Sequence, residues 1–133
     1  MPPRRKIDPI AGRTALDAWR NGDESRPTLT MAVRFLLEEL AQVAPGNAVE
    51  VRVPPAGAVQ CVDGPRHTRG TPPNTVEMNP HTWLELATGI VTWEKARHDG
   101  RVRASGVRAD LSPFLPLHAA RSRTPLPESR EGD

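Results

Sequence analysis

The sequence predicts a single α+β domain, in which a small, mainly antiparallel sheet is covered on one face by helices. Three observations support this fold class. Residues 28–44 repeat apolar side chains at intervals of three and four, as one face of a helix does. Residues 49–53 alternate valine with charged residues, as a half-buried strand does. Residues 75–117 contain short apolar segments separated by turn-forming residues, which is typical of closely packed strands and helices.

The longest helix is predicted over residues 28–44, and a proline–glycine pair ends it. Its apolar face consists of Leu29, Val33, Leu36, Leu37, Leu40 and Ala44. Glu38 and Glu39 share the opposite, polar side of this helix. A shorter helix is predicted over residues 11–21, where a glycine follows the last apolar position.

Four strands are predicted. They cover residues 49–53, 58–62, 75–78 and 101–105. Two consecutive prolines end the first strand, and the glycine that follows begins the return, so the second strand is expected to run antiparallel to the first.

Two short helices are predicted between the third and fourth strands. Asn79 is a natural N-cap, and Pro80 suits the first helical position because that position needs no N–H donor. Gly89 can adopt the left-handed conformation that ends the first helix. Thr92 can cap the second helix, and Gly100 can end it.

Length and composition limit the class of protein. A chain of 133 residues can bury the core of one domain, which we expect over residues 11–117. Residues 1–10 are predicted to be a flexible segment and residues 118–133 a disordered tail. The formal net charge of +2 does not indicate a nucleic-acid-binding protein.

The lone Cys61 excludes an internal disulfide and favours a reducing compartment. The basic N-terminus lacks the apolar stretch of a signal peptide, and no segment is long and apolar enough to span a bilayer. We therefore expect a cytoplasmic protein without stable membrane insertion.

Four segments resemble a known family. They read GAVQC at residues 57–61, GPRHTRGTPPN at 64–74, TWLELATG at 82–89 and ASGVRADLSPFLPL at 104–117. These strings are similar to a bacterial branch of the sterol carrier protein type 2 family, and the similarity extends over roughly residues 7–117. The resemblance implies the same α+β fold. It also implies a hydrophobic tunnel between sheet and helices that holds a lipid or acyl chain without covalent chemistry.

The candidate ligand-lining residues are apolar side chains from the predicted helices and strands. They are Leu36, Leu40, Cys61, Val76, Trp83, Leu86, Ile90 and Trp93. Large apolar residues at helical spacing are also what an ordinary filled core requires, so both interpretations remain open.

A polar rim is predicted in the loop at residues 64–74. Arg66 and Arg69 present planar guanidinium groups suited to a carboxylate or phosphate, and His67 can add a third donor. The alternative is that these side chains bind the loop's own carbonyls or pair with Asp63 and Glu77.

Catalytic chemistry is not indicated. Cys61 and His67 do not form a convincing nucleophile–base pair, because Cys61 lies in an apolar strand that disfavours the thiolate. The four histidines are isolated and lack the spacing of metal ligands. We expect no catalytic residue, no metal and no cofactor.

The sequence therefore favours a non-enzymatic protein that binds a lipid, an acyl chain or another apolar small molecule in a cavity between helices and sheet. The alternative is a protein-interaction or regulatory module that keeps the fold without a ligand cavity. Neither interpretation identifies the protein partner, if there is one, and neither involves nucleic acid.

Overall fold

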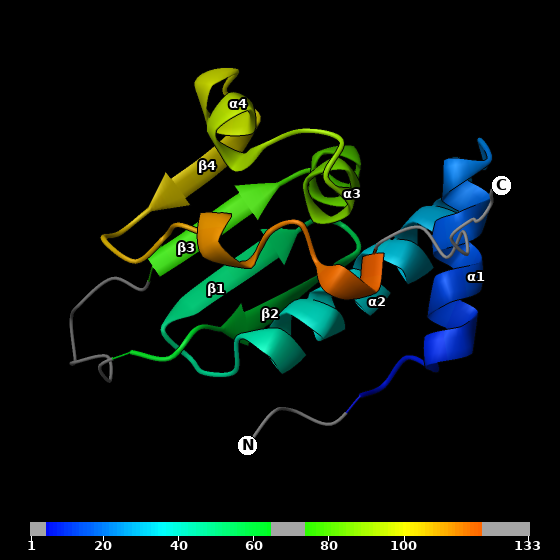
Figure 1. Cartoon of the computed structure of the whole chain (residues 1–133), viewed down its shortest axis with the longest axis horizontal. Coiled ribbons are helices and arrows are strands. Elements are labelled where there is room, and N and C mark those ends of the chain that lie inside the picture. The colour runs from blue at the N-terminus through cyan, green and yellow to red at the C-terminus, as the bar shows by residue number, and fades with distance from the viewer. Residues whose placement is uncertain (1–4, 65–73, 121–133) are drawn as a thin grey trace, which may run out of the picture.

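The structure is a computed structural model that describes residues 5–64 and 74–120. Helices lie against one open sheet (Figure 1). In chain order the elements are α1 (Pro9–Arg20), α2 (Arg26–Val43), β1 (Val49–Val53), β2 (Gly57–Cys61), β3 (Asn74–Met78), α3 (Pro80–Thr88), α4 (Trp93–His98), β4 (Val102–Ser105) and the short 3₁₀ helices η1 (Ser112–Phe114) and η2 (His118–Ala120).

The sheet has the strand order β2-β1-β3-β4. The β1–β2 and β3–β4 pairs are antiparallel, whereas β1 and β3 are parallel. Val51 of β1 lies opposite Val59 on one side and Val76 on the other, so valines from three strands line the same face. The mainly antiparallel sheet confirms the predicted α+β class.

The two faces of the sheet differ in burial. Val49, Val51 and Val53 point into the core and are at most 1% exposed. Arg52 and Gln60 lie on the opposite face and are exposed to solvent. The helices and the closing segment 111–120 cover the valine face, as Figure 1 shows for the segment that crosses in front of the strands. The sheet is therefore covered on one face, as predicted.

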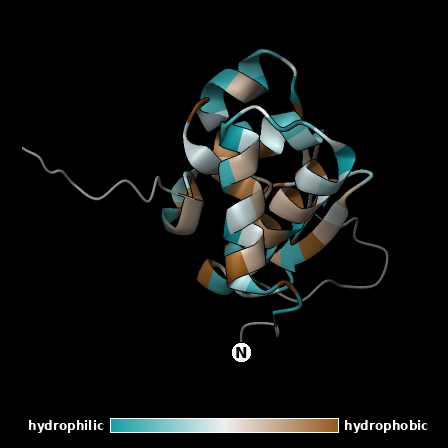
Figure 2. Ribbon diagram, turned by 90° about the vertical axis from the view of Figure 1, so that its right-hand side faces the viewer, coloured by the Kyte–Doolittle hydropathy of each residue, from teal (hydrophilic) through white to brown (hydrophobic). Residues whose placement is uncertain are grey.

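The helix boundaries follow their capping residues. The Asn79 side chain accepts a hydrogen bond from the Thr82 N–H at 2.8 Å, and Gly89 ends α3 with a φ of +86°. The Thr92 hydroxyl accepts a hydrogen bond from the Lys95 N–H at 3.1 Å and caps α4. These predicted caps are confirmed. Figure 2 shows hydrophobic and hydrophilic residues alternating along the helices, as in amphipathic helices.

The ends of the described chain contact the body of the domain. Residues 5–7 lie against α2, and α1 begins at Pro9, earlier than the helix predicted over 11–21. At the other end, Ala120 is buried and its carbonyl accepts a hydrogen bond from the Arg20 guanidinium. The remaining parts of the predicted flexible segment and tail, residues 1–4 and 121–133, lie outside the described residues.

Gly12 sets the distance between α1 and α2. A Cβ atom added at this buried glycine would overlap the Phe35 ring of α2 and lie 2.7 Å from the Phe35 Cβ atom. Glycine costs stability inside a helix, so its presence here reflects the close approach of the two helices.

We expect Gly12→Ala to destabilise the protein by up to about 2 kcal/mol. Overpacking against Phe35 costs about 1–3 kcal/mol and outweighs the gain of about 1 kcal/mol in helix propensity. Urea denaturation measures the change, with Thr14→Ala at an exposed position of α1 as the control. A Gly12→Ala variant as stable as the parent protein would show that the two helices do not approach so closely.

Candidate functional site

A groove lies between α2 and β2, at the edge of the sheet. Its volume is about 440 Å³, which falls in the range of about 300–1,000 Å³ typical of small-molecule sites. Residues 6 and 7 of the N-terminal segment contribute a third wall. The lining residues are Lys6, Ile7, Arg34, Leu37, Glu38, Ala41, Gln42, Ala56, Gly57, Ala58 and Val59.

One face of α2 supplies the first wall. The α2 residues that line the groove are Arg34, Leu37, Glu38, Ala41 and Gln42. Their spacing of three and four places them on a single face of the helix. This face borders the core face, because Leu37 belongs both to the groove and to the buried core. The position of the groove is therefore fixed by the packing of α2.

Small residues create the space between α2 and the sheet. Ala41 on α2 and Ala56 and Gly57 on the β2 side all line the groove. A Cβ atom added at Gly57 would lie 3.4 Å from Arg34 Cγ and 3.6 Å from Leu37 Cδ1, which is ordinary van der Waals contact. A larger side chain at position 57 would extend into the groove, so the absence of a side chain there contributes to its volume.

Glu38 holds the third wall in place. Its two carboxylate oxygens accept hydrogen bonds from the backbone N–H groups of Lys6 and Ile7, each at 3.0 Å. The neighbouring Glu39 forms an ion pair with Arg5. Adjacent carboxylates of α2 therefore attach residues 5–7 to the helix.

Arg34 lies at the rim on the β2 side. Its Nε–H donates a hydrogen bond to the Ala56 carbonyl at 2.6 Å. This contact links α2 to the turn that precedes β2 and restrains the guanidinium group beside Gly57. The groove thus has an apolar floor with charged groups around its opening.

A comparison with protein families identifies the fold family. A family model described as bacterial SCP ortholog, where SCP denotes sterol carrier protein, matches residues 25–117, more than half of the chain. The chain belongs to this SCP family. The predicted resemblance is confirmed. The match begins directly before α2 and includes every groove residue except Lys6 and Ile7. No curated protein matches the chain.

In this SCP-family structure, seven of the eight predicted ligand-lining residues are buried in one contiguous core. They are Leu36, Leu40, Cys61, Val76, Trp83, Leu86 and Trp93. The eighth, Ile90, is 63% exposed, because it follows the left-handed Gly89 in the turn after α3. None of the eight lines the groove described above, and a ligand-lining role for them stays a prediction.

The predicted polar rim, Arg66, His67 and Arg69, lies outside the described residues. Sequence reasoning did not identify the polar groups that the structure places at the groove. The sequence does contain one indication of these groups: Arg34 and Glu38 lie beside the apolar face of α2, four residues apart and therefore on the same side of the helix. No local pattern predicts that Lys6 lies against this face, because Lys6 and its partner Glu38 are 32 residues apart in the sequence.

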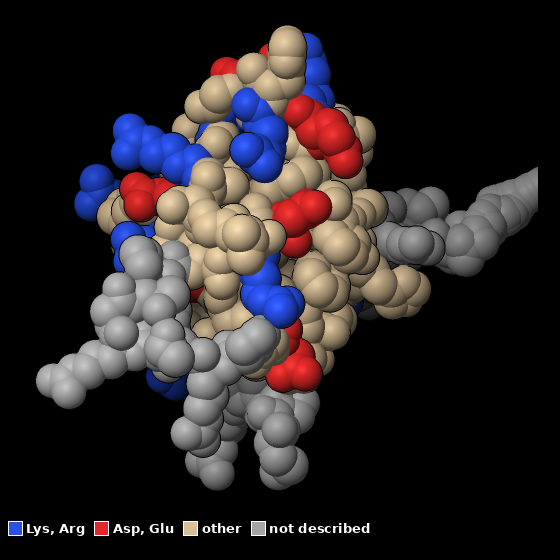
Figure 3. Space-filling model, turned by 90° about the vertical axis from the view of Figure 1, so that its left-hand side faces the viewer, with Lys and Arg blue, Asp and Glu red and all other residues tan. Residues whose placement is uncertain are grey.

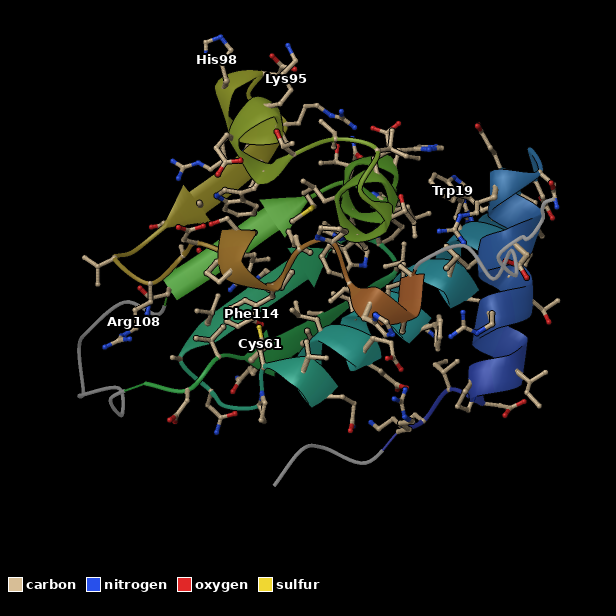
Figure 4. The ribbon with its side chains drawn as sticks, viewed as in Figure 1. Trp19, Cys61, Lys95, His98, Arg108 and Phe114 are labelled. Carbon is tan, nitrogen blue, oxygen red and sulfur yellow. The ribbon has the colours of Figure 1, made fainter. Side chains whose placement is uncertain are left out.

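Cys61 is placed as a core residue and not as a nucleophile. It is fully buried, and burial raises the pKa of its thiol to about 12. The described histidines, His81, His98 and His118, are all exposed, and Figure 4 shows His98 on α4 far from Cys61. Within residues 5–64 and 74–120, no three His, Cys, Asp or Glu side chains come together to hold a metal ion.

Two further observations concern the surface. Lys and Arg side chains are interspersed with Asp and Glu on the face shown in Figure 3, so this face has no field of a single sign. Among the helices of the described chain, none combines the length and the apolar character that crossing a bilayer requires.

The buried thiol predicts a pH dependence of stability. The folded protein keeps the Cys61 proton up to about pH 12, whereas the unfolded chain releases it near pH 9.0. Stability should therefore fall between these values by roughly 1.4 kcal/mol per pH unit. The chain has no tyrosine, so no phenol titrates in this window.

Urea denaturation from pH 8 to pH 11 tests this dependence. The Cys61→Ala variant should be less stable at pH 8, because it leaves a small cavity, but it should lose the steep decline at higher pH. The same decline in the variant would mean that the thiol is not responsible.

Proposed function

We propose that this SCP-family protein binds a small apolar molecule, such as a lipid or an acyl chain, in the groove between α2 and β2. The observation that supports this function is the groove itself. It combines a volume of about 440 Å³ with a floor of apolar side chains and a charged rim, the usual composition of a small-molecule site. Membership of the SCP family supports the same class of ligand.

Burial of apolar surface would supply the affinity. Leu37, Ala41 and Val59 present aliphatic carbon to the groove, and each methylene that a ligand buries fully contributes about 0.8 kcal/mol. Binding and release would involve no covalent step, because the one thiol is buried and protonated at neutral pH. We propose sequestration and transfer of the ligand in the cytoplasm, a compartment that suits a lone reduced cysteine.

We expect Gly57→Val to weaken binding of a neutral apolar dye, Nile red, by at least about tenfold. The added side chain would occupy the space beside Arg34 and Leu37, and valine is compatible with an edge strand. Dye fluorescence titration measures the affinity. The matched control is Gln60→Val, which adds valine to the opposite, exposed face of the same strand and should leave the affinity unchanged.

Extraction of the purified protein with organic solvent, followed by mass spectrometry, searches for a natural ligand. Co-purified lipid in the parent protein and its loss in Gly57→Val would support the groove as the site. A protein that binds no dye and carries no lipid would contradict the proposal and would favour the interaction-module alternative.

A further inference from the structure

We infer that the groove selects an apolar molecule that carries one anionic group, and that Arg34 and Lys6 are the residues that recognise this group. The inference rests on the proposed function, because it concerns the ligand of the same groove. It follows from the charges at the rim, from their hydrogen-bond partners and from the position of Glu38.

Arg34 is positioned to bind an anion. Its Nε–H donates a hydrogen bond to the Ala56 carbonyl at 2.6 Å. This bond restrains the guanidinium group beside Gly57. Within the part of the chain that the structure describes, its terminal nitrogens have no hydrogen-bond or ion-pair partner. A restrained guanidinium with free terminal N–H groups matches the geometry of a carboxylate or a phosphate.

Glu38 does not neutralise Arg34, although one helical turn separates them on α2. The Glu38 carboxylate is directed to the N–H groups of Lys6 and Ile7 instead, so both of its oxygens accept backbone hydrogen bonds. Glu38 therefore binds the N-terminal segment and does not form the ion pair with Arg34 that a spacing of four residues on a helix permits.

Lys6 adds a second positive charge to the rim. Its backbone N–H binds Glu38, but among the described residues its ammonium group has no partner. Two cationic residues and one carboxylate therefore border the groove, and Gln42 is neutral. This excess of positive charge beside an apolar floor is complementary to an amphiphile with a single negative head group.

Carboxylate and phosphate share the chemistry that a guanidinium recognises, so the experiment tests both. The ligands are decanoic acid, decyl phosphate and 1-decanol, which have the same alkyl chain and different head groups. Each displaces Nile red from the intact protein at pH 7.5. We expect at least one of the two anions to bind about tenfold more tightly than the alcohol, with the difference reduced at 0.5 M salt.

Substitution of Arg34 separates charge recognition from apolar binding. In Arg34→Met, the preference for the anion over the alcohol should fall to about twofold, while Nile red still binds. Arg34→Lys should restore part of the preference, because it keeps the charge but loses the planar fork. Arg26→Met removes the same charge from an exposed position at the start of α2 and should leave the preference unchanged.

The outcomes distinguish this inference from the proposed function. Equal displacement of Nile red by both anions and by the alcohol would overturn the anion selectivity and leave the apolar groove intact. A preference that persists in Arg34→Met would overturn the role of Arg34. Failure of Nile red and all three ligands to bind would remove the proposed function and the selectivity together.

Discussion

The packing of α2 is the constraint on which the rest of the structure depends. This helix contacts α1, β2 and α3, and it contributes more than one surface to the interior. Phe35 packs against Gly12 of α1, and the Trp83 indole N–H of α3 donates a hydrogen bond to the Val33 carbonyl at 3.3 Å. Leu37 faces β2 and forms part of the groove floor. A single helix therefore fixes the relative positions of α1, α3 and the sheet edge.

This arrangement couples the groove to the core. Leu37 and Ala41 line the groove, but both are almost fully buried and adjacent to core residues of the same helix. A rotation or shift of α2 would disturb the tight packing at Phe35 and Trp83 as well as the groove. The α2 wall is consequently preorganised, which reduces the ordering cost that binding would otherwise incur. The wall formed by residues 6 and 7 is attached differently, through hydrogen bonds to one carboxylate.

Local patterns in the sequence were sufficient to predict the α-helices and strands of the fold, but not the short 3₁₀ helices η1 and η2 of the closing segment. The repeat of apolar residues located α2, the alternation of valines located β1, and Asn79 and Thr92 located the starts of α3 and α4. Each of these signals acts over a few residues. The parallel pairing of β1 with β3 depends on how distant segments meet, and the strand patterns alone do not specify it.

The groove was harder to predict for the same reason. Ala41 looks like an ordinary small core residue in the sequence, and only the packing of α2 beside the sheet edge gives it a role in forming the groove, together with Ala56 and Gly57. Arg34 looks like a solvated helix residue until the turn before β2 is placed beside it. The large apolar residues are conspicuous in the sequence, but large side chains tend to fill an interior, as Trp83 does here.

The location of the groove also bears on how the protein would handle a ligand. Arg34, Lys6 and Ala58 are exposed, so one side of a bound molecule would remain in contact with water. Each methylene would then contribute less than the roughly 0.8 kcal/mol that complete burial provides. Affinity would be lower than in an enclosed tunnel, because part of the bound molecule would keep its contact with water. If the proposed function holds, this lower affinity would favour exchange of a ligand with a donor or an acceptor over long-term storage.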